Sequence, residues 1–277
     1  DIMTEKKAEM SQAMKEKLAP KQFIKNPIKG TKYTLLISSA KGGVGKSTFA
    51  INIAFALQNL GLKIGILDAD VYGPSLPKLI AINEKPQSKE GKFLIPIEKY
   101  NAQCMSMGFL VEETTPMIWR GPMVISAIKT MTENVLWKDL DVIVIDMPPG
   151  TGDTQLTFAQ QIKVDGAVIV STPQDLALLD VKRGIEMFNK TGIKIIGLVD
   201  NMSFFKSDDG KKYNIFGEGG VEKTAKEYKK EFLGKIPIHQ DLRDANDKGD
   251  PLTHSNPEHE VSLEFKKIAE KIKRAFQ

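Results

Sequence analysis

Residues 35–48 read Leu-Leu-Ile-Ser-Ser-Ala-Lys-Gly-Gly-Val-Gly-Lys-Ser-Thr, an apolar strand followed by a glycine-rich turn and the start of a helix. Gly42, Gly43 and Gly45 allow backbone angles at which successive N–H groups point toward an anion. The positive end of the helix that follows adds to this attraction. The stretch therefore predicts a phosphate-binding loop. A glycine-rich turn that binds nothing is the weaker interpretation, because a lysine lies inside the turn.

Two side chains of the loop carry the nucleotide chemistry. Lys46 is expected to reach the β- and γ-phosphates, and Ser47 to bind Mg²⁺ beside them. Phosphate loops usually carry a glycine where this chain has Ala40, and an additional lysine, Lys41, follows it. We predict a nucleotide site in which the binding residues are consecutive: Gly42, Gly43, Val44, Gly45, Lys46, Ser47 and Thr48.

The composition is that of an ordinary globular chain. It has 277 residues, 41% hydrophobic and 27% charged, enough for one large α/β domain or two small ones. No apolar run is long enough to cross a bilayer and the amino end has no signal-peptide character, so we expect a cytoplasmic protein. The single cysteine, Cys104, rules out an internal disulfide and is expected to be a buried thiol.

The net charge of +4 comes entirely from residues 1–32, which hold eight lysines and four acids. The remainder has 31 basic and 31 acidic residues, so nucleic acid is not an expected partner. Residues 1–32 are helical in tendency up to Leu18 and then extended, and we expect a basic tail or linker ahead of one domain at 33–277. Because the chain begins at Asp1 without an initiator methionine, a longer precursor is a further expectation.

Beyond residue 33, strand-like apolar runs alternate with helical patterns, as in βαβ units. Strands are predicted at 34–38, 63–67, 142–145, 167–171, 193–199 and 233–236, with two short runs at 93–97 and 103–107 that could pair as a hairpin. Helices are predicted at 46–60, 122–136, 154–162, 175–190, 219–230 and 258–275. The prediction is an α/β fold: a single P-loop NTPase domain with a mostly parallel sheet of seven or eight strands and helices on both faces.

Two carboxylates follow the second predicted strand, at Asp68 and Asp70. Ligands of open α/β sheets lie beyond the carboxyl ends of the strands, so both are candidates for the site. Their spacing places both side chains on one face of an extended chain. One of the two would steer Mg²⁺-bound water and the other would orient the attacking water. Helix capping and turn formation by Asp70 is the alternative.

A third acid ends the apolar run at 142–145. Asp146 has the form of a Walker B residue, which holds Mg²⁺ directly or through water. The sequence Met-Pro-Pro-Gly-Thr-Gly-Asp follows it at 147–153, where prolines stiffen the exit and glycines leave N–H groups free to meet a γ-phosphate. Apolar runs that end in Asp are common, but together with the glycine-rich loop about a hundred residues upstream the pair is specific.

Side chains near the other strand ends are less specific. Asn201 follows the strand predicted at 193–199, and its amide could read a purine edge by donating and accepting together. A turn-forming Asn is an equally serious interpretation. The three histidines, His239, His254 and His259, lie in polar surroundings and are expected to be solvated.

Six segments in one order resemble the Mrp (ApbC-like) iron–sulfur cluster carrier ATPases, of the MinD/ParA class with a deviant Walker A motif. The resemblance covers nearly all of residues 31–275. Its segments are Lys41-Gly-Gly-Val-Gly-Lys-Ser-Thr48, Asp68-Ala-Asp-Val-Tyr-Gly-Pro-Ser75, Trp119-Arg-Gly-Pro122, Asp146-Met-Pro-Pro-Gly-Thr-Gly-Asp153, Thr172-Pro-Gln-Asp175 and Asn201-Met-Ser203.

The resemblance implies a slow, Mg²⁺-dependent ATPase that forms a homodimer and delivers Fe–S clusters to other assembly proteins or recipient apoproteins. By it, Lys41 would cross to the partner subunit's nucleotide, Asp70 would orient water and Asp146 would be the Walker B acid. Asn201 would contact adenine, with the backbone near Pro237 beside the base. The implied catalytic residues are Lys41, Lys46, Asp70 and Asp146, and the implied metal residues are Ser47, Asp68 and Asp146.

One departure concerns the cluster. Members of the family commonly place a Cys-x-x-Cys shortly after the Asn-Met-Ser segment, and here residues 204–214 contain no cysteine. Two Cys104 side chains in a dimer fall short of the four ligands a cluster normally needs. We therefore expect no stable cluster held by this chain's own cysteines.

A MinD/ParA-like positioning switch on a membrane or partner is the alternative function. The carboxyl end approximates an apolar stripe flanked by basic residues, as a membrane-binding helix would show. Its apolar members are Leu263, Phe265, Ile268, Ala269, Ile272 and Phe276. Globular domains routinely end in a helix packed on the sheet, so that interpretation is favoured and membrane binding is not expected.

Overall fold

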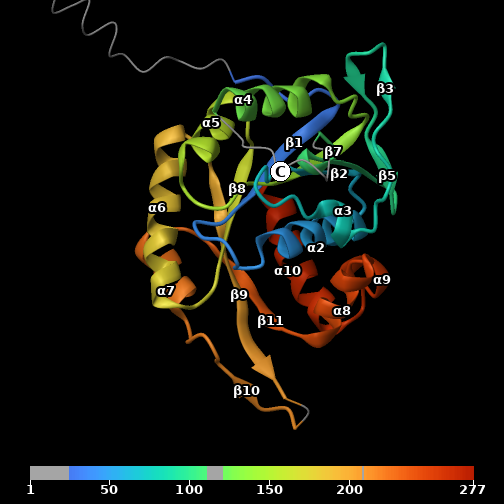
Figure 1. Ribbon diagram of the computed structural model, residues 1–277. Helices are drawn as coiled ribbons and strands as arrows, with labels where there is room; N and C mark the ends of the chain where they lie inside the picture. The colour runs from blue at the N-terminus through green and yellow to red at the C-terminus, as the bar shows by residue number, and fades with distance from the viewer. Residues whose placement is uncertain (1–24, 111–120, 208) are drawn as a thin grey trace, which may run out of the picture.

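The structure is a computed structural model that describes residues 25–110, 121–207 and 209–277. A mostly parallel sheet forms the centre of the fold (Figure 1). The strand order is β10-β9-β8-β1-β7-β2-β6-β5, and β11 pairs with β9. The parallel strands are β1 (Thr31–Ser38), β2 (Ile64–Asp68), β6 (Ala102–Ser106), β7 (Leu140–Asp146), β8 (Gly166–Ser171), β9 (Ile195–Lys206) and β11 (Phe232–Ile238).

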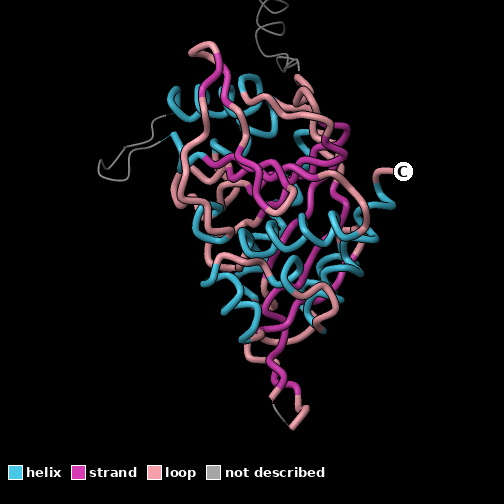
Figure 2. The backbone as a smooth tube through the Cα atoms, turned by 90° about the vertical axis from the view of Figure 1, so that its right-hand side faces the viewer, coloured by secondary structure: helices cyan, strands magenta, loops and turns pink. Residues whose placement is uncertain are grey.

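The sheet has nine strands in the described residues, against the seven or eight predicted. The seven parallel strands match the prediction. The difference comes from two short antiparallel strands, β5 (Ile97–Lys99) and β10 (Lys212–Tyr213), too brief to give a sequence pattern. The end of β9 and β10 project from the lower end of the molecule in both views (Figures 1 and 2). The α/β prediction is confirmed.

Helices cover both faces of the sheet, because neighbouring residues of each central strand point to opposite sides. Leu35 and Ile37 of β1 belong to one apolar core and Leu36 to the other. The first core is covered by α2 (Lys46–Asn59), α3 (Leu76–Leu79), α8 (Gln240–Lys248), α9 (Leu252–Ser255) and α10 (Glu260–Ala275). The second is covered by α4 (Gly121–Lys129), α5 (Asp153–Gln161), α6 (Asp175–Thr191) and α7 (Gly220–Glu227).

The predicted hairpin is wrong in its pairing. β6 pairs with β5, whereas β4 (Phe93–Leu94) pairs with β3 (Ser88–Lys89) in a separate two-stranded sheet. The turn between β5 and β6 has only two residues, Tyr100 and Asn101, and both have positive φ (51° and 58°). A turn of that type suits the twist of a tight hairpin, so it fixes the pairing to the nearer strand.

The helix predicted at 122–136 is shorter in its α-helical part. α4 ends at Lys129, and a π-helical turn, η2 (Thr130–Asn134), continues it. Three further helices in the described residues, α3, α8 and α9, were not predicted, since α3 and α9 have only four residues each and the sequence of α8 is polar and has no apolar period.

The described part of the predicted tail is packed on the domain. Ile28 is buried in the second core, Asn26 bridges to Ile162, and β1 begins at Thr31. We therefore place the start of the folded domain before residue 33. The helical tendency predicted up to Leu18 lies outside the described residues.

The last helix is buried along its apolar stripe. α10 lies against α2 although the two are distant in sequence, with Phe49 and Phe265 ring centroids 5.6 Å apart (Figure 1). Phe276 stacks on Tyr33 at 4.9 Å. The stripe therefore serves core packing, as favoured from the sequence. Among the described residues there is no helix with the length and apolar character required to cross a membrane.

Candidate functional site

The glycine-rich loop joins β1 to α2 at the carboxyl edge of the sheet. Gly43 and Gly45 have φ of 80° and 77°, and Gly45 is the N-cap of α2. These angles favour glycine, and at Gly45 a side chain would also collide, since an added Cβ would lie 2.4 Å from Asn201 Nδ2. The Asn201 amide donates to the Val44 carbonyl at 2.8 Å. Asn201 therefore holds the loop in its curved form.

A cavity of about 380 Å³ opens over the loop. Its volume is within the range of small-ligand sites. Segments far apart in sequence contribute to it: the loop, the chain after β2, Pro149 beyond β7, and the last turn of α8. Its lining residues are Ser39, Gly42, Gly43, Gly45, Lys46, Ser47, Thr48, Asp70, Gly73, Ser75, Lys78, Leu79, Pro149, Asn246 and Asp247.

Lys46 lies among buried acids. Its side chain is 6% exposed, and its ammonium forms an ion pair with the Asp146 carboxylate and lies 4.0 Å from Asp70 Oδ2. Burial raises the pKa of Asp146, and Lys46 opposes that rise. The neighbouring hydroxyl of Ser47 is 3.4 Å from the Lys46 ammonium. The structure thus brings together the lysine, the serine and two of the acids predicted from three separate segments.

Asp68 is fully enclosed by donors. It accepts hydrogen bonds from the N–H groups of Ser75 (2.8 Å) and Leu76 (3.0 Å) and from the Ser106 hydroxyl (3.0 Å), while its other oxygen accepts from the Asp70 N–H. Burial, with repulsion from Asp146, raises the pKa of Asp68 to about 7. Asp68 therefore holds the loop that carries Asp70 in place, through hydrogen bonds to both ends of that loop.

Asp70 forms the turn considered from the sequence and also lines the cavity. Its Oδ1 accepts from the N–H groups of Tyr72 and Gly73, each at 3.1 Å, and so forms a turn. Its Oδ2 faces Lys46 in the cavity. A turn-forming carboxylate can therefore present its second oxygen to a ligand.

Lys41 is exposed at the other end of the loop. Its side chain makes no hydrogen bond or ion pair within the described part of the chain. The backbone around Lys41 is anchored by two hydrogen bonds of Ser39. The Ser39 hydroxyl donates to the Lys41 carbonyl (2.9 Å), and the Ser39 carbonyl accepts from the Gly150 N–H (2.9 Å). This second bond links the glycine-rich loop to the loop after β7.

The structure does not bring Pro237 into this cavity. Pro237 lies in β11 and lines a different cavity, together with Phe204 and His239. Asn201 touches the loop from behind and is also absent from the lining. Of the Trp119–Pro122 segment, Trp119 and Arg120 lie outside the described residues.

Four lining residues were missed from the sequence: Lys78 and Leu79 of α3, and Asn246 and Asp247 of α8. Asn246 and Asp247 come from the last turn of α8, and Asn246 donates to the Thr48 hydroxyl at 3.1 Å. The Asn246 Oδ1 is buried and has no hydrogen-bond partner in the described structure. The only sequence signal is the end of a polar helix at Gly249, which adopts the left-handed conformation that favours glycine.

Cys104 is remote from this chemistry. It lies in β6, is 0% exposed, and belongs to the first apolar core. Burial raises the pKa of its thiol to about 12. The buried thiol expected from the sequence is thus confirmed, and a buried, protonated thiol is a poor metal ligand.

Comparisons with known proteins find relatives that match most of the chain. The family model described as ParA, NUBPL iron-transfer P-loop NTPase, matches residues 30–273. "Iron-sulfur protein required for NADH dehydrogenase, mitochondrial" from Arabidopsis thaliana is 49% identical over 88% of this chain and 78% of its own length. "Iron-sulfur cluster carrier protein" from Escherichia coli K12 is 48% identical over 88% of this chain and 67% of its own.

Solved structures show the same fold. A nucleotide-binding protein from Archaeoglobus fulgidus in complex with ADP has a TM-score of 0.70 and 37% identity, covering 79% of this chain and 87% of that one. The cell division ATPase MinD of Pyrococcus furiosus has a TM-score of 0.65 at 22% identity, over 87% of this chain and 98% of its own. That second likeness concerns the fold alone.

Proposed function

Since the chain belongs to the ParA family of NUBPL-type iron-transfer P-loop NTPases, we propose that it binds and slowly hydrolyses ATP and uses that cycle in handling iron–sulfur clusters. One observation carries the proposal: the glycine-rich loop, the buried Lys46 and Asp70 line one cavity of small-ligand size, and Lys46 also pairs with Asp146 at the end of β7. The curated relatives named as cluster carriers support the cluster part.

The cavity fits a polyphosphate. The loop N–H groups and the start of α2 form a concave cradle, and Lys46 stands within it as the counter-charge. In this structure the Lys46 ammonium pairs with the Asp146 carboxylate. An oxygen of a bound phosphate would take the place of that carboxylate as the partner of the ammonium. Lys46 therefore acts in binding the β- and γ-phosphates.

The donor set also fits Mg²⁺. Two buried carboxylates, Asp70 and Asp146, flank Lys46, and a third, Asp68, is buried near Asp146, where burial and then repulsion from Asp146 raise its pKa to about 7. Asp146 and the Ser47 hydroxyl would hold the ion, which supplies charge neutralisation at the phosphates. Asp68 is proposed to position the loop of Asp70 and to act on Mg²⁺ only through it, because its oxygens already accept four protein hydrogen bonds.

Hydrolysis needs a water in line with the γ-phosphate. Asp70 is proposed to orient it, since its Oδ2 faces the cavity while its Oδ1 is fixed by the turn. Lys41, exposed and extended from the edge of the loop, is proposed to cross to the nucleotide of a second copy in an ATP-closed homodimer. Asn201 is proposed to act on the loop, and contact of Asn201 or Pro237 with adenine remains a prediction.

For the cluster, the chain is proposed to work with ligands from other proteins. Cys104 is enclosed in the core, and residues 204–214 hold no cysteine. An ATP-driven partner of an assembly protein or recipient apoprotein fits this arrangement. The MinD-like switch has less support, because the MinD likeness is 22% identical and the terminal stripe is packed inside the domain.

The cytoplasm is the proposed compartment, since the only cysteine is unpaired and buried, as in reducing surroundings. Subcellular fractionation tests it. Recovery of the protein in the mitochondrial fraction would contradict it; the Arabidopsis relative is named as a mitochondrial protein.

Hydrolysis is tested with Asp70→Asn. We expect ATP binding to be retained and phosphate release to fall on the order of a hundredfold, because a neutral amide orients water less well and accepts no proton. The turn should survive, since the amide oxygen can still accept from Tyr72 and Gly73, and circular dichroism checks that the variant is folded. A folded variant that hydrolyses ATP at the wild-type rate would refute the role of Asp70.

A further inference from the structure

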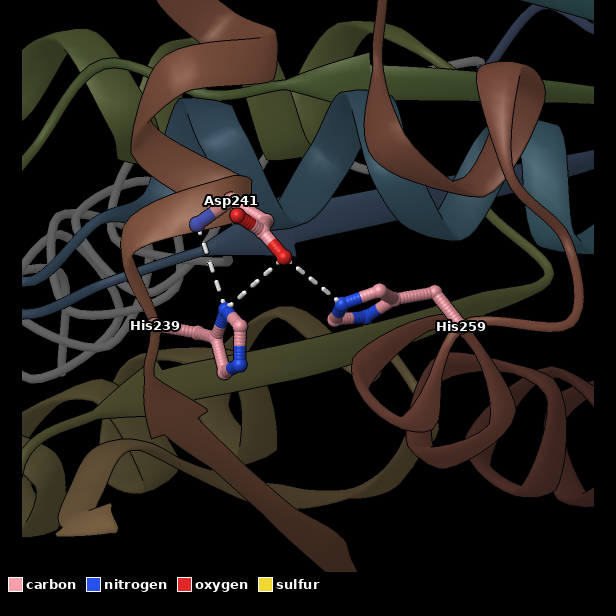
Figure 3. Close-up of side chains that lie close together, drawn as sticks. All are labelled: His239, Asp241 and His259. Atoms are coloured by element: carbon pink, nitrogen blue, oxygen red, sulfur yellow. Dashed lines mark hydrogen bonds and ion pairs between the residues drawn. The ribbon is translucent and has the colours of Figure 1, made fainter. Parts of the chain in front are cut away.

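Two of the three histidines meet one acid outside the nucleotide cavity. His239 lies between β11 and α8, Asp241 is in the first turn of α8, and His259 precedes α10. One ligand atom from each lies within 4.8 Å of the other two. Figure 3 shows the two imidazoles and the carboxylate pointing toward one another. We propose that His239, Asp241 and His259 form a binding site for a divalent transition-metal ion.

The spacing fits a metal of ordinary size. Asp241 Oδ2 lies 3.0 Å from His259 Nε2 and 3.8 Å from His239 Nδ1. Two ligands on a tetrahedral ion with bonds of about 2.0–2.1 Å are roughly 3.3 Å apart, so small side-chain rotations suffice. Two imidazoles and a carboxylate also leave coordination positions open to water, which is the pattern of zinc and non-haem iron(II) sites.

His239 already has the tautomer that ligation needs. Its Nδ1 accepts from the Asp241 N–H at 3.2 Å, so the ring proton is on Nε2. That nitrogen lies 3.6 Å from Glu260 Oε1, and Glu260 is held by Lys206 at 3.0 Å. A ligating histidine commonly directs its other ring N–H to a carboxylate, and Glu260 occupies that position here.

His259 needs one rearrangement. Its Nδ1 accepts from the Val261 N–H at 3.1 Å, so its Nε2 carries the proton directed at Asp241. Ligation through Nε2 places a metal where that proton now lies. The proton moves to Nδ1, and the Val261 capping bond is lost, as is the Asp241 N–H bond to His239. The metal–ligand bonds must outweigh the loss of two helix-capping hydrogen bonds, so binding should be reversible. The affinity should increase with pH, because protons compete with the metal for the ligand atoms.

The site is also reachable and held in place. The side chains of His239 and His259 are 24% and 16% exposed, and that of Asp241 is 57% exposed. Each histidine is fixed at the start of a helix that packs into the first apolar core. The remaining histidine, His254, bonds to Asp250 at 2.8 Å and is a control outside the cluster.

The test is a titration of the full nucleotide-free chain with Co²⁺, followed by its visible absorption, and with Zn²⁺ by calorimetry. His239→Asn and His259→Asn are the informative variants, because Asn remains a good helix cap while it removes the imidazole. We expect one equivalent bound by the wild type, tighter at higher pH, and at least tenfold weaker binding in both variants with thermal stability unchanged. His254→Asn should bind as the wild type does. Absence of binding in the wild type, unchanged affinity in either cluster variant, or an equal loss in His254→Asn would overturn the proposal.

Discussion

Gly45→Ala should damage the nucleotide loop more than Gly43→Ala, although both glycines have positive φ. At Gly43 an added Cβ meets nothing within 4 Å, so the cost is the left-handed backbone alone, about 1–2 kcal/mol. At Gly45 the same Cβ would lie 2.4 Å from Asn201 Nδ2. That collision displaces the amide from the Val44 carbonyl and adds the loss of a buried hydrogen bond, about 1 kcal/mol or more.

Urea unfolding of both variants measures the difference. We expect Gly45→Ala to lose about 2–3 kcal/mol of unfolding free energy, and Gly43→Ala about 1 kcal/mol less than that. The double variant, Gly45→Ala with Asn201→Ala, has no collision. Its loss of unfolding free energy should therefore be smaller than the sum of the losses in the two single variants. Equal destabilisation by the two alanines, or strict additivity in the double variant, would refute the idea that Asn201 shapes the loop.

Lys41→Ala should keep ATP binding but lose ATP-dependent dimerisation in analytical ultracentrifugation; a dimer that closes as in the wild type would exclude a crossing lysine. Because burial and Asp146 raise the pKa of Asp68 to about 7, the folded state binds more protons than the unfolded chain between about pH 4 and 7, and the stability contribution of Asp68 falls as pH rises through that window. The urea midpoint of Asp68→Asn should therefore vary less with pH there, and an unchanged slope would count against the burial argument. Anaerobic reconstitution with iron and sulfide should leave no cluster held by the chain after desalting; charge-transfer absorbance with near-stoichiometric iron, lost in Cys104→Ser, would show that the buried thiol ligates.

Local patterns in the sequence were sufficient to predict the glycine-rich loop, the buried strands and Asp146. These features depend on a few adjacent residues: apolar runs form strands covered on both faces, and glycines in fixed order form the anion cradle. The two-residue turn at Tyr100 and Asn101 was missed, since neither residue is the glycine that such turns favour.

Contacts between distant segments could not be predicted in this way. α8 buries only Leu242 and Ala245, too little for an apolar period, and it is stabilised at its ends by His239 and Gly249. Its place beside the loop, which brings Asn246 to Thr48, depends on packing of the whole first core. Of the three histidines expected to be solvated, His239 and His259 are helix caps and lie side by side, because two helix starts meet there, and His254 stacks on Tyr100.

The most direct test of the nucleotide site is calorimetric titration of ATP, with and without Mg²⁺, into the wild type and Lys46→Ala. Lys46 is the only described lysine buried in the cavity, and a charge-assisted bond to phosphate contributes about 1.5–3 kcal/mol. We predict binding to the wild type that Mg²⁺ strengthens, and at least about tenfold weaker binding to Lys46→Ala. Failure of the folded wild type to bind ATP at millimolar concentration, or equal affinity in Lys46→Ala, would contradict the account.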